Sequence, residues 1–241
     1  MQMDISKWIQ FNPKITVEQT TKKYFGKFLY KLVVYCPAGR LIDSKDSMYE
    51  ALTHRREVKK SFNYGGYWGI RHNRDLDKAD IDFLETMRVI RKNPAGFKLR
   101  VEEPRIQIYA GTEKELIELV NTQLLPFVGF IESVSGPADA NAEAVLNSGA
   151  IIRKKDVGYR YKIILKDGRY SLEDKSALLT YLSQLGPETV KVSNTGFEML
   201  KKSTGFIWNL YIYTNDPSIS MFLNLMHPGI VLNCHELVVV E

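Results

Sequence analysis

The sequence predicts an α+β fold in which one series of strands and helices occurs twice. Two runs that are rich in aromatic and β-branched residues, 24–36 and 159–166, are typical of strands, and each is followed by a turn and a helix. Two later segments, 105–136 and 208–240, each contain a strand, a helix and a second strand. Because both series have the same order, the sequence predicts an internal duplication.

The first series begins after a leader. Residues 1–20 form this leader, and its aromatic side chains are available to pin it to the body. The strand 24–36 ends at a turn that contains proline and glycine. Residues 45–57 then predict a short helix, with Asp43 or Ser44 as its N-cap.

The second series has stronger local signals. Asp167-Gly168 predicts a hairpin turn from the preceding strand into a short strand over 169–172. Residues 173–185 predict an amphipathic helix that ends before Gly186. These elements lie in the order expected from the first series.

The boundaries of the two units follow from this repeat. We place unit 1 at 21–137 and unit 2 at 158–241. The stretch between them, 138–157, begins with small and polar residues, which is typical of a linker, and can hold a short helix over 139–146.

Individual residues recur at matching places in the two units. The matches are Tyr30 with Tyr161, Gly39 with Gly168, Tyr109 with Tyr213, Pro126 with Pro228, and Glu132 with Glu236. Each unit is predicted to run strand, helix, strand, strand, helix, strand (βαββαβ), with an added hairpin strand after the first. This is the ferredoxin-like plan, in which an antiparallel sheet carries both helices on one face and leaves the other face open.

Unit 1 carries an insertion. Tyr30 and Tyr109 are 79 positions apart, whereas Tyr161 and Tyr213 are 52 apart, which leaves 27 extra residues within 55–95. An insertion that the scaffold does not need is a common place for binding residues. Its second half predicts a helix with an apolar side.

The insertion contains a basic and aromatic stretch at residues 54–74. Six cationic side chains stand beside one acidic side chain, so its net charge of +5 equals that of the whole chain. Cations for phosphates, rings for stacking on bases and glycines for close approach are the components of a single-strand nucleic-acid contact. The predicted binding residues are Arg55, Arg56, Lys59, Lys60, Tyr64, Tyr67, Trp68, Arg71, His72 and Arg74.

Two other interpretations of residues 54–74 stay open. In one, the glycine-rich centre is a hairpin turn whose rings pack on the body while the charges are solvated. In the other, the stretch contacts a protein partner.

A second candidate surface is the open sheet face of unit 2. Residues 201–206 share a lysine, a glycine and a phenylalanine with the third strand of RNA-recognition motifs, although not their spacing. Strand alternation predicts Trp208, Leu210 and Ile212 on one face. It predicts Asn209, Tyr211 and Tyr213 on the other, where the rings either pack structurally or stack on bases.

Composition bounds the cellular context. The net charge of +5 is compatible with a polyanionic partner. Asp4 and Lys7 interrupt the N-terminus, and no apolar run approaches the length of a membrane span, so we expect a soluble, cytoplasmic protein without a membrane partner. Cys36 and Cys234 are expected to be buried free thiols in a reducing compartment.

Catalytic and metal-binding patterns are weak. No two of the four histidines have the spacing of metal ligands. Four acids at the start of the predicted insertion helix spread around its axis, which favours a solvated acidic face over a metal site: Asp75, Asp77, Asp80 and Asp82. We therefore assign no catalytic residue, metal ligand or cofactor, and predict that the chain is not an enzyme.

In plan, two tandem ferredoxin-like units resemble the CRISPR-repeat-processing RNA endonucleases and related repeat-associated RNA-binding proteins. The resemblance covers element order over most of the chain and implies RNA binding across the cleft between the units. Members usually have a glycine-rich loop near the C-terminus, where this chain has one glycine, and a catalytic histidine near the first helix, where His54 is nearest. Because no motif matches, no catalytic residue is carried over.

Three functions are therefore under consideration. The first is a non-catalytic accessory protein, of the kind that viruses or mobile elements use, that binds single-stranded or structured RNA or DNA through the insertion. The second is an adaptor or assembly protein that docks other proteins or a second copy of itself. The third is an RNA endonuclease that uses His54 or His72 as acid or base.

Overall fold

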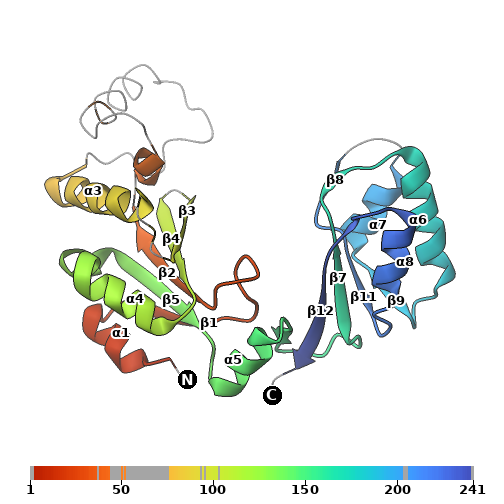
Figure 1. Ribbon diagram of the computed structural model, residues 1–241, viewed down its shortest axis with the longest axis horizontal. Coiled ribbons are helices and arrows are strands. Elements are labelled where there is room, and N and C mark those ends of the chain that lie inside the picture. Colours follow the sequence, from red (N-terminus) through yellow and green to blue (C-terminus); the bar gives the residue numbers. More distant parts are fainter. Residues whose placement is uncertain are drawn as a thin grey trace. The chain divides into compact units, whose positions relative to one another are not determined.

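The computed structural model consists of two compact units, Met1–Glu143 and Ala144–Glu241 (Figure 1). The division lies within the stretch 138–157. Across the described residues there are seven α-helices and two mixed five-stranded sheets, which confirms the α+β class. The structure describes residues 3–36, 38–43, 50, 52, 76–92, 94, 96–102, 104–202 and 206–239.

Unit 1 begins with a helix and an edge strand, both within the predicted leader. Its helices are α1 (Ile5–Phe11), η1 (Gly39–Asp43), α3 (Lys78–Lys92), α4 (Glu113–Leu119), η2 (Val120–Leu124) and η3 (Leu125–Phe130). Its strands are β1 (Thr16–Gln19), β2 (Tyr30–Tyr35), β3 (Lys98–Glu102), β4 (Arg105–Ala110) and β5 (Ile131–Gly136). The helix α5 (Ala140–Asn147) crosses the division and confirms the short helix predicted there.

Unit 2 has the predicted strands and helices, together with additional short elements. Its helices are α6 (Leu172–Gln184), α7 (Asn194–Lys201) and α8 (Ile219–Met226). Its strands are β6 (Ile151–Arg153), β7 (Tyr161–Leu165), β8 (Gly168–Arg169), β9 (Val190–Val192), β10 (Phe206–Ile207), β11 (Tyr211–Thr214) and β12 (Val231–Val239). The predicted helix α6 starts at a capping box in which Ser171 and Asp174 satisfy each other's backbone N–H groups.

The two five-stranded sheets have the same strand order. The order is β1-β5-β2-β4-β3 in unit 1 and β6-β12-β7-β11-β9 in unit 2. Four strands of each sheet pair in antiparallel fashion, in an order compatible with the ferredoxin-like plan. The prediction of purely antiparallel sheets is wrong, because β1 and β6 each add a parallel edge strand beside β5 and β12.

Two strand predictions also need correction. The strand predicted over 24–36 begins only at Tyr30, because Phe25 and Gly26 have positive φ angles and the chain turns there. The hairpin predicted at Asp167-Gly168 does not form with β7. Instead, β8 pairs with β10 in a separate two-stranded sheet.

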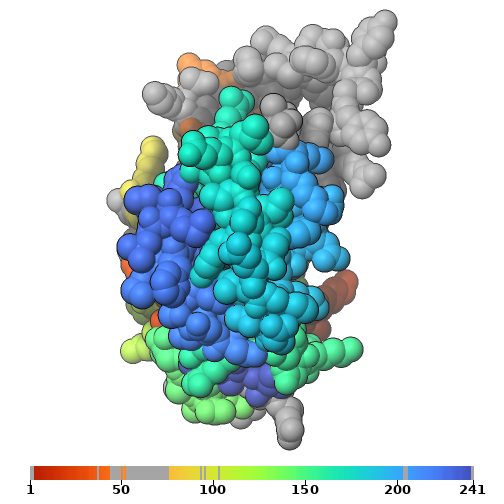
Figure 2. Space-filling view, turned by 90° about the vertical axis from the view of Figure 1, so that its right-hand side faces the viewer, coloured from red at the N-terminus to blue at the C-terminus, as the bar shows by residue number. Residues whose placement is uncertain are grey.

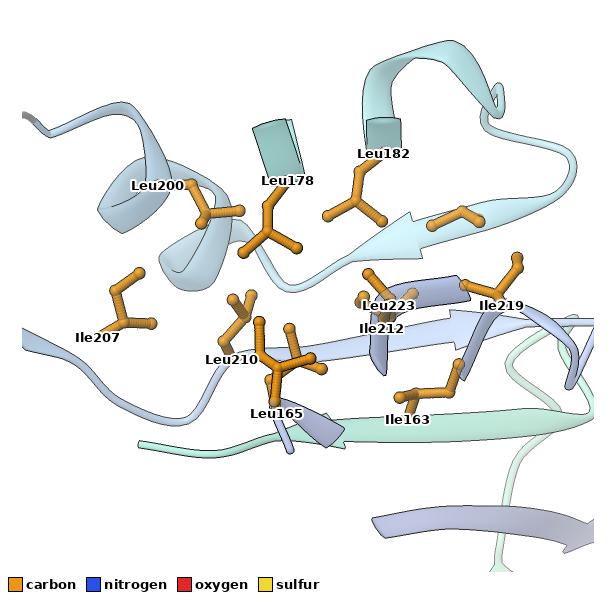
Figure 3. Close-up of a cluster of buried hydrophobic side chains, with 12 residues drawn as sticks. Ile163, Leu165, Leu178, Leu182, Leu200, Ile207, Leu210, Ile212, Ile219 and Leu223 are labelled. Carbon is orange, nitrogen blue, oxygen red and sulfur yellow. The ribbon is translucent and has the colours of Figure 1, made fainter. Parts of the chain in front are cut away.

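In unit 2, helices cover one face of the sheet (Figures 1 and 2). Figure 2 shows this helical face, with α6 in teal between α8 in dark blue and α7 in lighter blue. Beneath the helices, Leu178 and Leu182 of α6 and Leu200 of α7 meet apolar side chains of the strands (Figure 3). This buried cluster fixes which residues of β7 and β11 face the helices.

The leader of unit 1 is packed into the unit by one buried contact. The indole Nε1 of Trp8 donates a hydrogen bond of 2.8 Å to Glu113 at the start of α4, and the ring is fully buried. The backbone N–H of Asp4 donates to the same carboxylate. The expected pinning of the leader by an aromatic side chain is confirmed.

The helix α3 belongs to the core of unit 1, although the sequence places it in an insertion. Phe83 is buried and packs against the rings of Phe127 and Phe130 in η3. At its start, Asp80 and Asp77 each accept a backbone N–H of the other. Asp80 is therefore buried, which corrects the prediction of a fully solvated acidic face.

The two thiols differ from each other. Both cysteines are free, but only Cys36 is buried, whereas Cys234 is exposed. The expectation of two buried thiols is therefore wrong for Cys234, which lies on β12 opposite Ile163.

Candidate nucleic-acid interface

Alternation along the central strands of unit 2 gives its sheet an apolar face and a polar face. Ile163 and Ile212 are fully buried on the helical side. Their neighbours Lys162, Tyr211 and Tyr213 therefore lie on the opposite, open face. The predicted division between Ile212 and the two tyrosines is confirmed.

A row of three side chains crosses this open face. On neighbouring strands, Lys191 of β9 lies opposite Tyr213 of β11, and Tyr213 lies opposite Lys162 of β7. We call these three residues the unit 2 row. On β12 the row continues to His235, whose Nδ1 is 2.9 Å from the carbonyl oxygen of Gly149.

Further rings extend the unit 2 row. Tyr159 stacks on Tyr213 with ring centroids 6.3 Å apart, and Tyr211 meets Tyr213 edge to face at 5.3 Å. The ammonium of Lys162 lies 3.9 Å from the centroid of the Tyr211 ring, a cation–π contact. Cations and half-exposed rings thus alternate across the centre of the sheet.

The electrostatics of this face are positive. Burial raises the pKa of the Tyr213 phenol, and the nearby Arg153 guanidinium opposes that rise. Among the residues that the structure describes, no acidic side chain forms an ion pair with Lys191 or Arg153. Within the described residues, the charges of these two side chains are therefore not balanced by an ion pair.

A groove borders the unit 2 row on the side of β9. It is lined in part by Lys191, Tyr211 and Tyr213, and on another side by Trp208 and Asn209. Trp208 is 50% exposed and stacks on Phe206. The prediction that Trp208 shares the face of Leu210 and Ile212 is wrong, because Asn209 has a φ of 53° and interrupts the alternation.

Unit 1 contains the same row. Lys98 of β3 lies opposite Tyr109 of β4, and Tyr109 lies opposite Lys31 of β2. We call these three residues the unit 1 row. Its continuation on β5 is Ser135.

In unit 1 the chain itself covers the row. Residues 24–28, which we call the flap, turn back before β2 (Figure 1). Their rings pack on Tyr109. Tyr24 lies 5.2 Å and Phe25 lies 4.9 Å from Tyr109, measured between ring centroids. As a result Tyr109 is only 3% exposed, and burial raises its pKa.

Both lysines of the unit 1 row contact rings of the flap. The ammonium of Lys31 lies 5.4 Å from the centroid of Tyr24, and that of Lys98 lies 3.7 Å from the centroid of Phe25. Acidic neighbours also balance charge on this face, since Lys31 pairs with Glu18 and Arg105 with Glu132. The tyrosine of the unit 1 row is therefore covered, and the surroundings of the row are more nearly neutral.

The register changes one part of the alignment made from sequence. Lys31 and Lys162 lie opposite Ser135 and His235. Ser135 therefore corresponds to His235, and the match of Glu132 with Glu236 is displaced. The match of Tyr109 with Tyr213 agrees with the pairing in both sheets.

The binding residues predicted in the insertion, from Arg55 to Arg74, lie outside the described residues, as does most of the predicted helix 45–57. The structure instead draws attention to Lys98, which lies opposite Tyr109 in unit 1, and to Lys191, which lies opposite Tyr213 in unit 2; the sequence analysis singled out neither lysine. Each is a lysine between two apolar residues in a strand that precedes the tyrosine strand, and that pattern is the signal that identifies them.

The described part of the chain also bears on metal binding and on membrane insertion. There, no group of three histidine, cysteine, aspartate or glutamate side chains has an arrangement that would hold a metal ion. None of the helices that the structure describes combines the length and the apolar character needed to cross a bilayer.

No protein-family model matches the chain, and the search of curated proteins finds no match.

Proposed function

We propose that this protein binds single-stranded nucleic acid through the open sheet face of unit 2. The observation that carries the proposal is the unit 2 row, in which Tyr213 lies between Lys191 and Lys162 beside further exposed rings. Aromatic side chains on central strands stack on unpaired bases, and flanking cations neutralise phosphates. No catalytic step is part of the proposal.

We also propose that the two units are ferredoxin-like and arose by duplication, with additional residues in unit 1. The equal strand order and the occurrence of the row in both sheets support this. The duplication explains why a binding face would have a covered counterpart. The basic stretch 54–74 stays a predicted further contact.

The test is fluorescence anisotropy of labelled single-stranded RNA and DNA at two salt concentrations. We expect binding that weakens with salt, and a loss of about 5- to 150-fold for each stacking ring removed in Tyr211→Ala or Tyr213→Ala. The matched control is Tyr181→Ala, which removes a half-buried tyrosine from α6 on the helical side. Equal affinity of Tyr213→Ala and Tyr181→Ala would rule out the open face as the binding surface.

One observation favours a second function, that of an adaptor. The helix α8 presents an apolar stripe that includes Phe222 and Leu225, and Leu225 is 71% exposed. The stripe consists of Met221, Phe222, Leu225 and Met226. Apolar stripes of this kind are typical of protein interfaces.

Light scattering after size exclusion tests the adaptor function. A concentration-dependent oligomer that Leu225→Ser dissociates would support it. A monomer at all concentrations would show that the stripe does not bind a second copy of the chain. The adaptor function would then need a different protein as its partner.

A further inference from the structure

The flap of unit 1 shows what kind of group fits beside the row. Phe25 meets Tyr109 edge to face, and the ammonium of Lys98 lies 3.7 Å from the centroid of the Phe25 ring. One planar ring is thus held between the lysine and the tyrosine of the row. Such a contact combines aromatic packing with a cation–π interaction.

The backbone of Phe25 has an unfavourable conformation. Its φ is 53°, a region that costs a residue with a side chain about 1–2 kcal/mol. The contacts with Tyr109 and Lys98 offset that cost. The position beside the row therefore favours a planar ring enough to hold a strained residue there.

The equivalent position in unit 2 is built from the same two residue types. Lys191 and Tyr213 are paired as Lys98 and Tyr109 are. The rings that contact Tyr213 are Tyr159 and Tyr211, and no described ring of the unit lies over Lys191 as Phe25 lies over Lys98. Instead, the groove that Lys191, Tyr213 and Trp208 line lies at this position.

We infer that this groove is a base subsite, which takes one nucleobase of the strand between Lys191 and Tyr213, with Trp208 as a further wall. The inference rests on the proposed function and specifies how the ligand is held. The base takes the place that Phe25 has in unit 1, and the strand's phosphate lies within reach of the lysine. Asn209 is exposed beside the groove and offers an amide donor and acceptor to the edge of the base.

The ring surfaces of Tyr213 and Trp208 argue against a site that recognises phosphate alone. A purely electrostatic contact needs only the lysine, whereas Tyr213 and the half-exposed Trp208 contribute apolar ring surface. Stacking on such rings tolerates every base, because each base has a π-face. We therefore expect a preference for a base over no base, with weak discrimination among bases.

The experiment compares a single-stranded DNA of about 12 nucleotides with an abasic sugar–phosphate oligomer of equal length and charge. With wild-type protein, we expect the abasic oligomer to bind about 5- to 150-fold more weakly, the range for loss of one stacked base. Both oligomers should show falling affinity with rising salt.

Variants locate the subsite. Tyr213→Ala should lower the ratio between the two oligomers, and the double variant Tyr211→Ala/Tyr213→Ala should bring it close to one. Lys191→Gln should reduce the ratio and lower the slope of log affinity against log salt by about 0.7. The matched control is Lys166→Gln, which removes an equal charge from an exposed lysine beyond the end of β7 and should leave the ratio unchanged.

A conservative substitution distinguishes the loss of the ring from a folding defect. Tyr213→Phe keeps the ring and should keep the ratio, while Tyr213→Ala should lower the ratio although its circular dichroism spectrum stays that of the folded protein. Salt-dependent binding with equal affinity for the two oligomers would overturn the base subsite and leave the proposed function standing. Absence of binding to either oligomer would overturn both.

Discussion

Tyr109 and Tyr213 occupy the same place in two sheets of equal strand order, yet their surroundings differ. Tyr109 lies beneath three rings of the flap, whereas Tyr213 is half-exposed and is flanked by Tyr159 and Tyr211. The difference comes from a segment of five residues, 24–28, that turns back over one sheet. The tyrosine between two lysines is thus buried under the flap in unit 1 and part of a candidate binding surface in unit 2.

The arrangement of two lysines around a tyrosine does not by itself determine whether the row packs within the chain or faces solvent. The lysines of unit 1 contact rings of their own chain, and one of them also pairs with Glu18. In unit 2, Lys191 has neither kind of partner among the described residues. Whether a segment of the chain covers the tyrosine of the row decides whether its ring stabilises the fold or is accessible to a ligand.

The largest expected difference is in stability. Tyr109→Ala should lower the free energy of unfolding by about 3–5 kcal/mol, because it leaves a cavity beneath the flap. Tyr213→Ala should lower it by about 1 kcal/mol, since that ring is half-exposed. Urea unfolding followed by circular dichroism measures both. Equal losses would mean that the flap does not bury Tyr109 in solution.

Alkaline pH should separate buried from exposed tyrosines. Burial raises the pKa of Tyr30, at the start of β2, to about 12, with Glu143 and Glu113 adding to the rise. The folded state then favours the neutral phenol, so this stability is complete below about pH 10 and is lost as pH rises through about 12.

The matched variant for this prediction is Tyr30→Phe, which cannot ionise. Its free energy of unfolding should fall less between pH 10 and 12 than that of the wild type, by on the order of 1–3 kcal/mol. Urea titrations at several pH values measure the difference. Parallel curves for the two proteins would argue against a raised pKa.

Opening the flap should make unit 1 resemble unit 2. In Tyr24→Ala/Phe25→Ala, Tyr109 loses two of its covering rings, and Lys98 and Lys31 lose their cation–π partners. We expect a second oligonucleotide site per chain, weaker than the first, detected by isothermal titration calorimetry. If the stoichiometry is unchanged while near-ultraviolet circular dichroism confirms an intact fold, exposure of the unit 1 row is not sufficient for oligonucleotide binding.

The smallest effect concerns the turn of the flap. Gly26 has a φ of 68° with open space where a Cβ would lie, so Gly26→Ala should cost about 1 kcal/mol through backbone strain alone. The control is Gly129→Ala, where the space is also open and φ is not in the left-handed region, with an expected change within about 0.5 kcal/mol. Thermal melts compare the two, and a larger loss at Gly129 would contradict the assignment of strain to the flap.

Much of the fold could be predicted from the sequence by itself. The aromatic and β-branched runs predicted β2 and β7, and the period of apolar residues predicted α4 and α6. The end of α6 before Gly186 was also predicted. Alternation placed Ile212 and Tyr213 on opposite faces of their strand. These features depend on residues that are near each other in the chain, so a local pattern determines them.

Only the tertiary structure decided the register and the covering of the row. The pairing of Lys98 with Tyr109 and of Lys191 with Tyr213 joins different strands, and neither local propensity nor spacing determines which residues face each other. The parallel edge strands, the burial of Asp80 and the packing of the flap on Tyr109 likewise arise from contacts between segments far apart in sequence. Burial is a property of those long-range contacts, which is why the tyrosine of the row is buried in unit 1 and half-exposed in unit 2.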